Sequence, residues 1–412
     1  MTEAKEPEGP RGGTRAEEKD TAPRDAERAA RGEGAAAPRY APQVSSTGRV
    51  MPAEFSIALA EGRGATLPDG DYSRRKQSLR GFEDQYTDIV DYIVRITHRI
   101  WEDQDIGYIY DTYAPGCRVF DDSGPRHGIE DMVAGTVQAI AAFPNMRHYA
   151  DEVIWAGDDE QGFVTSHRAL NIGDHTGHWR WGPPTRRRLN TWVIANCVVR
   201  DNEIHEEWVL YNTAAKLQQL GLDVAACARE FGNAGALRPY TEREQAEVER
   251  LQGGRKPVAV PEPAPTGRFD VEEWVRALFH NTYNRRDLST IERFYAPNVR
   301  WYGATNRQGY GRQQVKAMAR ALLSTFPDLG VHVDEVYWMG NPDEGYRISV
   351  RWGGAGTHKG YSLYGAPTGR QVHIWGLSQL YVRHGEIVEE WALFNEFDVM
   401  AQLLRDEAAA LL

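Results

Sequence analysis

The chain has 412 residues, room for two domains of ordinary size, and 41% of them are hydrophobic, which predicts packed cores. The formal net charge is −11. Such an acidic chain lacks the basic face that binds phosphates, so we expect no nucleic-acid partner. No apolar run approaches the length of a membrane span and the N-terminus has no hydrophobic stretch, so we expect neither membrane association nor a secretory signal. The three cysteines form no CxxC pair and indicate no disulfide framework, and the predicted location is cytoplasmic.

One long segment of the chain occurs twice. Residues 143–212 align without a gap with residues 326–395, and both copies begin with Phe-Pro and contain Ile-x-Glu-Glu-Trp near the end. An internal repeat of this length predicts two domains of the same fold. Positions that the copies share are expected to be structural, whereas positions that differ show where one copy can have specialised.

The composition along the chain predicts five regions. Residues 1–45 cannot bury enough apolar surface to fold and are expected to be a disordered tail. Residues 46–80 are predicted to form an arm lying on the first domain. The first domain is expected over 81–231, a linker over 232–268 and the second domain over 269–412.

Within the linker, Thr241 and Glu244 have the spacing of a capping box. This spacing predicts a short, charged and solvated helix from Thr241 to Gln252.

The predicted elements of the two domains follow the same order. In the first domain, apolar residues at helical spacing predict a helix around 89–101, and a second helix is expected at 129–142, before Phe143-Pro144. Strands are expected around 148–156, 162–171, 188–200 and 203–211, with Asp201-Asn202 as a hairpin turn. In the second domain, helices are expected at 270–284 and 312–325, strands follow to about 394, and His384-Gly385 is the hairpin turn. Helices followed by a mostly antiparallel curved sheet indicate the α+β class.

The second copy resembles the SnoaL-like polyketide cyclase family of the NTF2-like superfamily. The resemblance is carried by Phe326-Pro327-Asp328, Val350-Arg351-Trp352, Thr357-His358, Pro367-Thr368-Gly369-Arg370 and Gly385-Glu386-Ile387-Val388-Glu389-Glu390-Trp391. The first copy keeps a weaker set: Phe143-Pro144, Arg168, His175, Pro184-Thr185 and Ile204-His205-Glu206-Glu207-Trp208.

This resemblance implies two cone-shaped α+β barrels, each with a curved sheet around helices and an apolar pocket. Members of the family perform acid–base chemistry on small molecules without a cofactor, commonly as cyclases, and relatives include dehydratases, isomerases and binding modules. The family's cyclases place a catalytic Asp directly after the Trp of the Glu-Glu-Trp motif. Val209 and Ala392 occupy that position here, so both copies lack this carboxylate.

Asp121 and Asp122 are the first candidates for chemistry, because copy two has Gly303-Ala304 in their place. In NTF2-like folds this region borders the pocket, where a paired acid can act as a base. The alternative is a polar turn before Ser123-Gly124, since Asp is a favoured turn residue.

His167 is the second candidate, because its counterpart in copy two is Val350. Alternation along a strand places His167 and Arg168 on opposite faces, so only one of them can enter the cone, and the sequence does not indicate which. His167 could be the acid or the partner of the base, and Arg168 could stabilise an oxyanion. A structural histidine is the alternative.

His175 and His98 occur in both copies, as His358 and His280, which favours a structural role such as pairing of His175 with the glutamates of the Glu-Glu-Trp motif. His175 could also stabilise an oxyanion, and His98 could serve as a pocket base or contact the substrate. We further include His127 and Asn212 among the predicted substrate-binding residues.

Trp179 and Trp181 flank Arg180 in a segment expected to form a loop at the cone mouth, where they could clamp an aromatic or anionic substrate. The alternative is packing of this loop against the second domain. The nearby run from Asp174 to His178 lacks the helical geometry of a metal motif, so neither a metal nor a cofactor is expected.

Tryptophans repeated on strands of both copies, Trp155 with Trp338 and Trp192 with Trp375, indicate an interface. We therefore expect the two domains to pack as an intramolecular pseudo-dimer, and the whole chain could also form a homodimer.

The excess of ionisable residues in the first copy favours a cofactor-independent enzyme of the lyase, cyclase or isomerase type, with its site in the first cone and a small molecule as substrate. The second domain would then be mainly supporting. The alternative is a binding or scaffold protein with two pockets and no turnover. A third possibility places the chemistry in the second domain, on His280, His358 and His373 beneath Trp301 and Tyr302.

Overall fold

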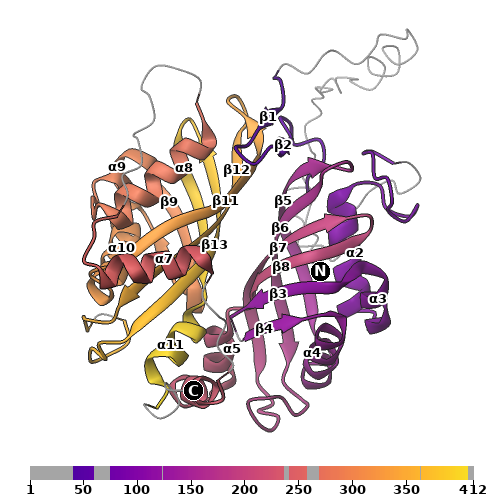
Figure 1. Cartoon of the computed structure of the whole chain (residues 1–412). Helices are drawn as coiled ribbons and strands as arrows, with labels where there is room; N and C mark the ends of the chain where they lie inside the picture. Colours follow the sequence, from indigo (N-terminus) through magenta and orange to yellow (C-terminus); the bar gives the residue numbers. More distant parts are fainter. Residues whose placement is uncertain are drawn as a thin grey trace, which may run out of the picture. The chain divides into compact units, whose positions relative to one another are not determined.

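Each domain contains a six-stranded sheet with helices against one face (Figure 1). The computed structural model describes residues 40–59, 75–122, 124–235, 241–257, 269–361 and 363–406, with only the backbone for residues 124, 125 and 127. Most of the predicted tail, residues 1–39, lies outside these ranges.

Domain 1 begins with helices and continues into the sheet. Its elements are α2 (Ile89–Trp101), η1 (Ile106–Tyr108), α3 (Ile109–Thr112), β3 (Tyr113–Asp121), β4 (Gly124–His127), α4 (Ile129–Ala142), β5 (Arg147–Asp158), β6 (Gly162–Asp174), β7 (Arg188–Arg200), β8 (Glu203–Leu210), α5 (Thr213–Leu220) and α6 (Val224–Asn233). The strand order is β4-β3-β8-β7-β6-β5, and every pair is antiparallel except β3 with β8.

The local sequence explains the main boundaries of domain 1. The Asp88 carboxylate accepts a hydrogen bond from the Asp91 amide at 2.8 Å and caps α2, whose buried isoleucines recur at helical spacing. Asp201 and Asn202 both have positive φ, 50° and 69°, which is the geometry that a tight hairpin between β7 and β8 requires. The predicted helices and the hairpin are therefore present.

Domain 2 repeats the order of elements and strands. Its elements are α8 (Val271–Phe279), the π-helical turn η2 (His280–Asn284), α9 (Thr290–Phe294), β9 (Tyr295–Gly303), η3 (Ala304–Asn306), β10 (Gln308–Tyr310), α10 (Arg312–Thr325), β11 (Gly330–Asn341), β12 (Gly345–Thr357), β13 (Gln371–Arg383), β14 (Glu386–Phe394) and α11 (Glu396–Leu404). The strand order β10-β9-β14-β13-β12-β11 matches that of domain 1. Both sheets are curved and mostly antiparallel, as predicted, but they stay open instead of closing into barrels.

The N-terminal arm contacts both domains, whereas the sequence predicted contact with the first alone. Its strand β2 (Val50–Met51) pairs with β1 (Gln43–Val44), which lies at the end of the segment predicted to be a disordered tail. The Trp155 indole donates to the Ile57 carbonyl at 2.8 Å in domain 1. On domain 2, the Gly340 amide donates to the Pro52 carbonyl at 3.0 Å. Backbone hydrogen bonds of this kind carry no signal in the side-chain pattern.

The linker helix α7 (Glu242–Gln252) has the capping box between Thr241 and Glu244. One face of this helix is buried instead of solvated, because α7 packs on β12 and encloses Glu244 and Val248. No sequence pattern indicated this contact, because charged residues dominate the segment and the contact face is short.

The sheets of the two domains contact each other through corresponding residues. The Arg168 guanidinium lies 4.2 Å from the Trp391 ring centre, and in the reverse direction Arg351 lies 4.5 Å from the Trp208 ring centre. Tryptophans also pair reciprocally, Trp192 with Trp391 and Trp375 with Trp208.

Hydrogen bonds follow the same reciprocal pattern. The Gln379 amide donates to the Ser166 hydroxyl at 3.0 Å, and the Asn196 amide donates to the Ser349 hydroxyl at 3.2 Å. In the repeat, Ser166 corresponds to Ser349 and Asn196 to Gln379. Contacts in which each side supplies the same positions are typical of a two-fold interface.

We expect Arg168→Leu to destabilise the protein by about 3 kcal/mol, because it removes a buried guanidinium that bonds Asp151, Gln379 and Tyr381. Arg351→Leu is the matched control, since its nearest carboxylate oxygens lie at 3.6 and 3.8 Å, and we expect a loss of about 1 kcal/mol or less. Urea unfolding measures both. Equal losses would show that Arg168 has no special part in the contact.

Candidate functional site

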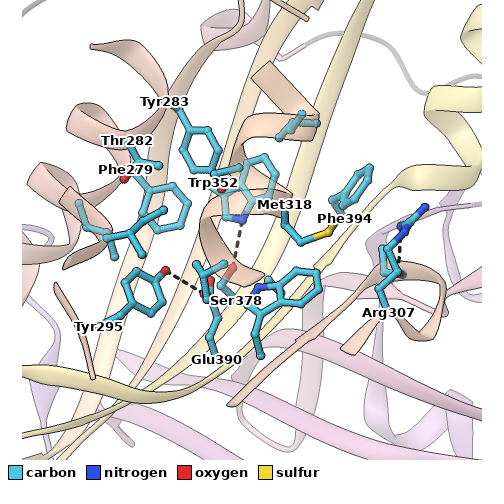
Figure 2. A pocket seen from close by; sticks show the side chains of 18 of the residues that line it. Phe279, Thr282, Tyr283, Tyr295, Arg307, Met318, Trp352, Ser378, Glu390 and Phe394 are labelled. Atoms are coloured by element: carbon cyan, nitrogen blue, oxygen red, sulfur yellow. Dashed lines mark hydrogen bonds between the residues drawn. The ribbon is translucent and has the colours of Figure 1, made fainter. Parts of the chain in front are cut away.

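Domain 2 contains a mostly apolar cavity with an empty volume of about 810 Å³, part of it open to solvent (Figure 2). Side chains from α8, η2, α10 and the sheet line it. The Tyr295 hydroxyl donates to the Glu390 carboxylate at 2.8 Å inside this cavity. Burial raises the pKa of Glu390 to about 7, against the opposing hydrogen bond of Tyr295.

Two further polar groups of this cavity are already paired. The Trp352 indole donates to the Ser378 hydroxyl at 3.3 Å, as Figure 2 shows. Arg307 forms hydrogen bonds of 2.7 and 2.6 Å with the Glu396 carboxylate. The domain 2 cavity thus offers one carboxyl group in largely apolar surroundings.

Domain 1 contains the corresponding cavity, with an empty volume of about 540 Å³. It has the same pair of side chains, since the Tyr113 hydroxyl donates to the Glu207 carboxylate at 3.3 Å. Burial raises the pKa of Glu207 to about 7, although Tyr113 and the charge of Arg126 oppose this shift. A carboxyl group with this pKa exists in both protonation states near neutral pH.

Alternation along the last strand of each sheet explains why only one glutamate of the Glu-Glu-Trp motif enters a cavity. In domain 1, Glu206 accepts a hydrogen bond from the Trp208 indole at 2.7 Å and pairs with Arg118 outside the cavity. Glu389 accepts the equivalent bond from Trp391 at 2.8 Å. Glu207 and Glu390 therefore point to the opposite face, toward the helices.

The domain 1 cavity also contains two histidines and an amide, His148 on β5 and His167 and Asn171 on β6. Burial lowers the pKa of His148 to about 3 and that of His167 to about 4, so both rings are neutral at physiological pH. Within the described residues, Nδ1 of each histidine and Oδ1 of Asn171 have no hydrogen-bond partner. These atoms leave unmet hydrogen-bonding capacity that a polar ligand would satisfy.

Domain 2 lacks these two histidines and this amide. The residues of domain 2 at the corresponding positions are Val331, Val350 and Gly354. The two cavities therefore share the tyrosine–glutamate pair and differ in the groups around it.

The predicted acids Asp121 and Asp122 lie where β3 approaches the start of α5. Asp122 accepts hydrogen bonds from the Thr213 amide at 2.8 Å, the Thr213 hydroxyl at 3.0 Å and the Tyr211 amide at 3.3 Å. Burial and the charge of Asp121 raise the pKa of Asp122 to about 6. Asp121 lies 3.2 Å from Arg126. In this structure Asp122 holds the beginning of α5.

Arg168 and His175 lie away from the domain 1 cavity. Arg168 occupies the other face of β6 from His167 and contacts domain 2, which settles the question that the sequence left open. His175 is bonded through Nδ1 to the Thr185 amide and hydroxyl, at 3.2 and 3.1 Å, and not to the glutamates that we expected. His358 and Thr368 repeat this arrangement.

The predicted substrate-binding residues are dispersed. His98 faces Glu102 and Asp103 at the end of α2, at 3.7 and 3.4 Å. Asn212 donates to Asn306 in domain 2 at 3.1 Å. The side chain of His127 lies outside the described residues.

Trp181 packs against the second domain, as the alternative interpretation stated, whereas Trp179 packs within domain 1. Trp179 contacts Phe143 edge to face, with ring centres 5.2 Å apart. Trp181 contacts Phe231 on α6 and Phe397 on α11 of domain 2.

Sequence reasoning missed Tyr113, Glu207 and His148 as cavity residues. A signal existed for His148, because a histidine that replaces Val331 of the other copy is the same signal that identified His167. Comparison of the two copies does not single out Glu207, because both copies have this glutamate.

The described part of the chain offers neither a metal site nor a membrane-spanning helix. Its His, Cys, Asp and Glu side chains form no group of three that could hold a metal ion. None of its helices is both long and apolar enough to cross a membrane.

A family model described as SnoaL-like polyketide cyclase matches residues 91–220 and 273–403, more than half of the chain. No curated protein matches this chain. Among solved structures, this chain is similar to a SnoaL-like protein from Jannaschia sp. CCS1, with 21% sequence identity and a TM-score of 0.31. The match covers 34% of this chain and 99% of that protein.

Two proteins from Streptomyces are also similar to this chain. AclR from Streptomyces galilaeus has 25% identity, a TM-score of 0.28 and coverage of 32% of this chain and 79% of its own. IdmH from Streptomyces antibioticus has 23% identity and a TM-score of 0.28, and the match covers 32% of this chain and 96% of IdmH. With the family model matched once in each half, this chain belongs to the SnoaL-like polyketide cyclase family and carries two of its domains in tandem.

Proposed function

We propose that this protein is a cofactor-independent acid–base enzyme, of the lyase, cyclase or isomerase type, that acts on a small organic molecule in the domain 1 cavity. The observation that carries the proposal is the buried Glu207, with a pKa of about 7, beside Tyr113. A general acid–base catalyst works best when its pKa lies near the operating pH. Glu207 meets this condition without the aspartate of the family's cyclases.

The surrounding groups suggest a division of roles. Ionised Glu207 takes a proton from a carbon next to a carbonyl group, and the Tyr113 hydroxyl orients the carboxylate. His148 and His167 are neutral, and each neutral ring keeps one N–H that can donate a hydrogen bond to a developing oxyanion. Domain 2 has the glutamate but lacks these histidines, which supports a mainly supporting role for it.

We also propose that the two domains form an intramolecular pseudo-dimer. The reciprocal pairs of Arg168 with Trp391 and Arg351 with Trp208 support this arrangement. Packing of this kind would hold β6 rigid, with His167 on its cavity face.

A second candidate function is binding without turnover. It is favoured by the domain 2 cavity, which is mostly apolar, and by Val209 and Ala392 at the position of the family's catalytic Asp. In that case both cavities would hold ligands that are recovered unchanged.

The proposed function predicts that the protein catalyses proton exchange next to a carbonyl group. With aryl ketones such as acetophenone in D₂O, we expect the protein to accelerate deuterium uptake at the carbon next to the carbonyl, measured by NMR. Glu207→Gln should lower this rate at least about 100-fold, because it removes the base. Glu390→Gln is the matched control and should retain the rate.

If only Glu390→Gln lowered the rate of deuterium uptake, the reaction would take place in domain 2, which would contradict the proposal. Ligands that raise the melting temperature but show no exchange with any carbonyl compound would favour the binding function.

Burial of Glu207 also predicts that the stability of the folded protein depends on pH. The pKa of Glu207 is about 7 in the folded protein and near 4.5 when unfolded, so the folded state holds this proton more tightly. The cost of ionising Glu207 is absent below pH 4.5, grows as the pH rises to 7 and is then constant, reaching about 3 kcal/mol. Glu207→Gln should therefore gain stability relative to the wild type over this window.

Urea unfolding at pH 4.5, 6 and 8 measures this difference. Glu390→Gln should behave in the same way, since burial also raises its pKa to about 7. A difference between variant and wild type that does not change with pH would show that the glutamate is not buried in an apolar site.

A further inference from the structure

Lys216 is a buried lysine on α5, with 9% of its surface exposed. Its counterpart in domain 2 is Val399, which is fully buried on α11. A lysine at a core position costs free energy, because its charge loses water. Within the described residues no carboxylate forms a direct ion pair with Lys216, although the charges of Asp122 and Asp121 offset part of this cost.

The amine lies beside the wall of the domain 1 cavity. Its Nζ atom is 4.7 Å from the centre of the Tyr211 ring, and Tyr211 lines the cavity. His148 also lines the cavity, and the charge of Lys216 is the largest contribution after burial to its lowered pKa. Tyr211 thus borders the amine, and the charge of the amine reaches His148.

We propose that Lys216 is a nucleophile that forms an imine with an aldehyde or ketone bound in the domain 1 cavity. The neutral Nζ attacks the carbonyl carbon and a C–N bond forms. The carbonyl oxygen leaves as water with one proton from the amine and one from solvent, so the product is a protonated imine. The protonated C=N bond accepts electrons more readily than the carbonyl did. This deepens the proposed function, on which it rests, by naming carbonyl compounds as the substrate class.

The imine also gives Glu207 a defined task. When Glu207 removes a proton from the carbon next to the C=N bond, the electron pair moves into a C=C bond and onto nitrogen, which yields an enamine. Return of a proton to the same carbon reverses the step, and return of a deuteron from D₂O leaves that carbon labelled. No oxidant, reductant or metal enters this balance.

The groups around Lys216 keep part of its amine neutral. Burial lowers the pKa of Lys216 to about 8, while the charges of Asp122 and Asp121 oppose this and that of Arg126 supports it. A lysine with this pKa has on the order of 100 times more free amine at pH 7 than one with an ordinary pKa. The remaining facing groups, Tyr211 and His148, are uncharged at that pH.

The experiment is reductive trapping on the full chain. Benzaldehyde, which is small and apolar, is added with sodium cyanoborohydride at pH 7, and benzylated lysines are located by peptide mass spectrometry. The chain has seven lysines, and two of them serve as internal controls because they are paired, Lys316 with Glu292 and Lys359 with Asp328. We expect Lys216 to be labelled at least about 10 times faster than either.

Two variants make the result decisive. Lys216→Arg keeps the positive charge but forms no imine, so labelling at this position should disappear and proton exchange on ketones should fall. Glu207→Gln should retain the label at Lys216 while losing exchange, which separates the two proposals. Labelling confined to the other lysines, or exchange that is unchanged in a folded Lys216→Arg protein, would overturn the assignment of Lys216.

Discussion

The two-residue alternation of side chains along the strands is the constraint on which the rest of this structure depends. Each sheet has one face toward its own helices and cavity and one face toward the other domain. On β6, His167 therefore enters the cavity while its neighbour Arg168 contacts domain 2. On β8, Glu207 enters the cavity while Glu206 and Trp208 lie on the opposite face. One strand thus supplies both the candidate chemistry and the domain contact.

The two copies of the repeat contain corresponding cavities, and the domain 1 cavity is the more polar of the two. Both keep the tyrosine–glutamate pair, and burial raises the pKa of the glutamate in each although the tyrosine opposes this shift. Only domain 1 adds His148 and His167, with the amine of Lys216 beside Tyr211 of the cavity wall, and each of these costs stability because it removes a polar group from water. Domain 2 has valine at all three positions. Such a contrast is expected when one copy keeps a function that the other does not need.

The sequence predicted much of the fold because its signals were local. Apolar spacing located α2, Phe-Pro ended α4 and α10, and turn residues located both hairpins. Its errors concern contacts between distant segments. The arm contacts domain 2 through backbone groups, and Trp181 packs on Phe397 instead of facing a cavity mouth. No local pattern records a partner that lies far away in the chain.

The sequence by itself determined the duplication, the α+β class, the family resemblance and His167 as a residue that sets domain 1 apart. Only the tertiary structure decided which of His167 and Arg168 enters the cavity, because a strand pattern gives alternation but not its direction. It also decided that Asp122 holds the start of α5, and it placed Glu207 beside Tyr113 and Lys216 beside Tyr211. The shifted pKa values of these groups arise from burial, which depends on the whole packed domain and not on neighbours in the chain.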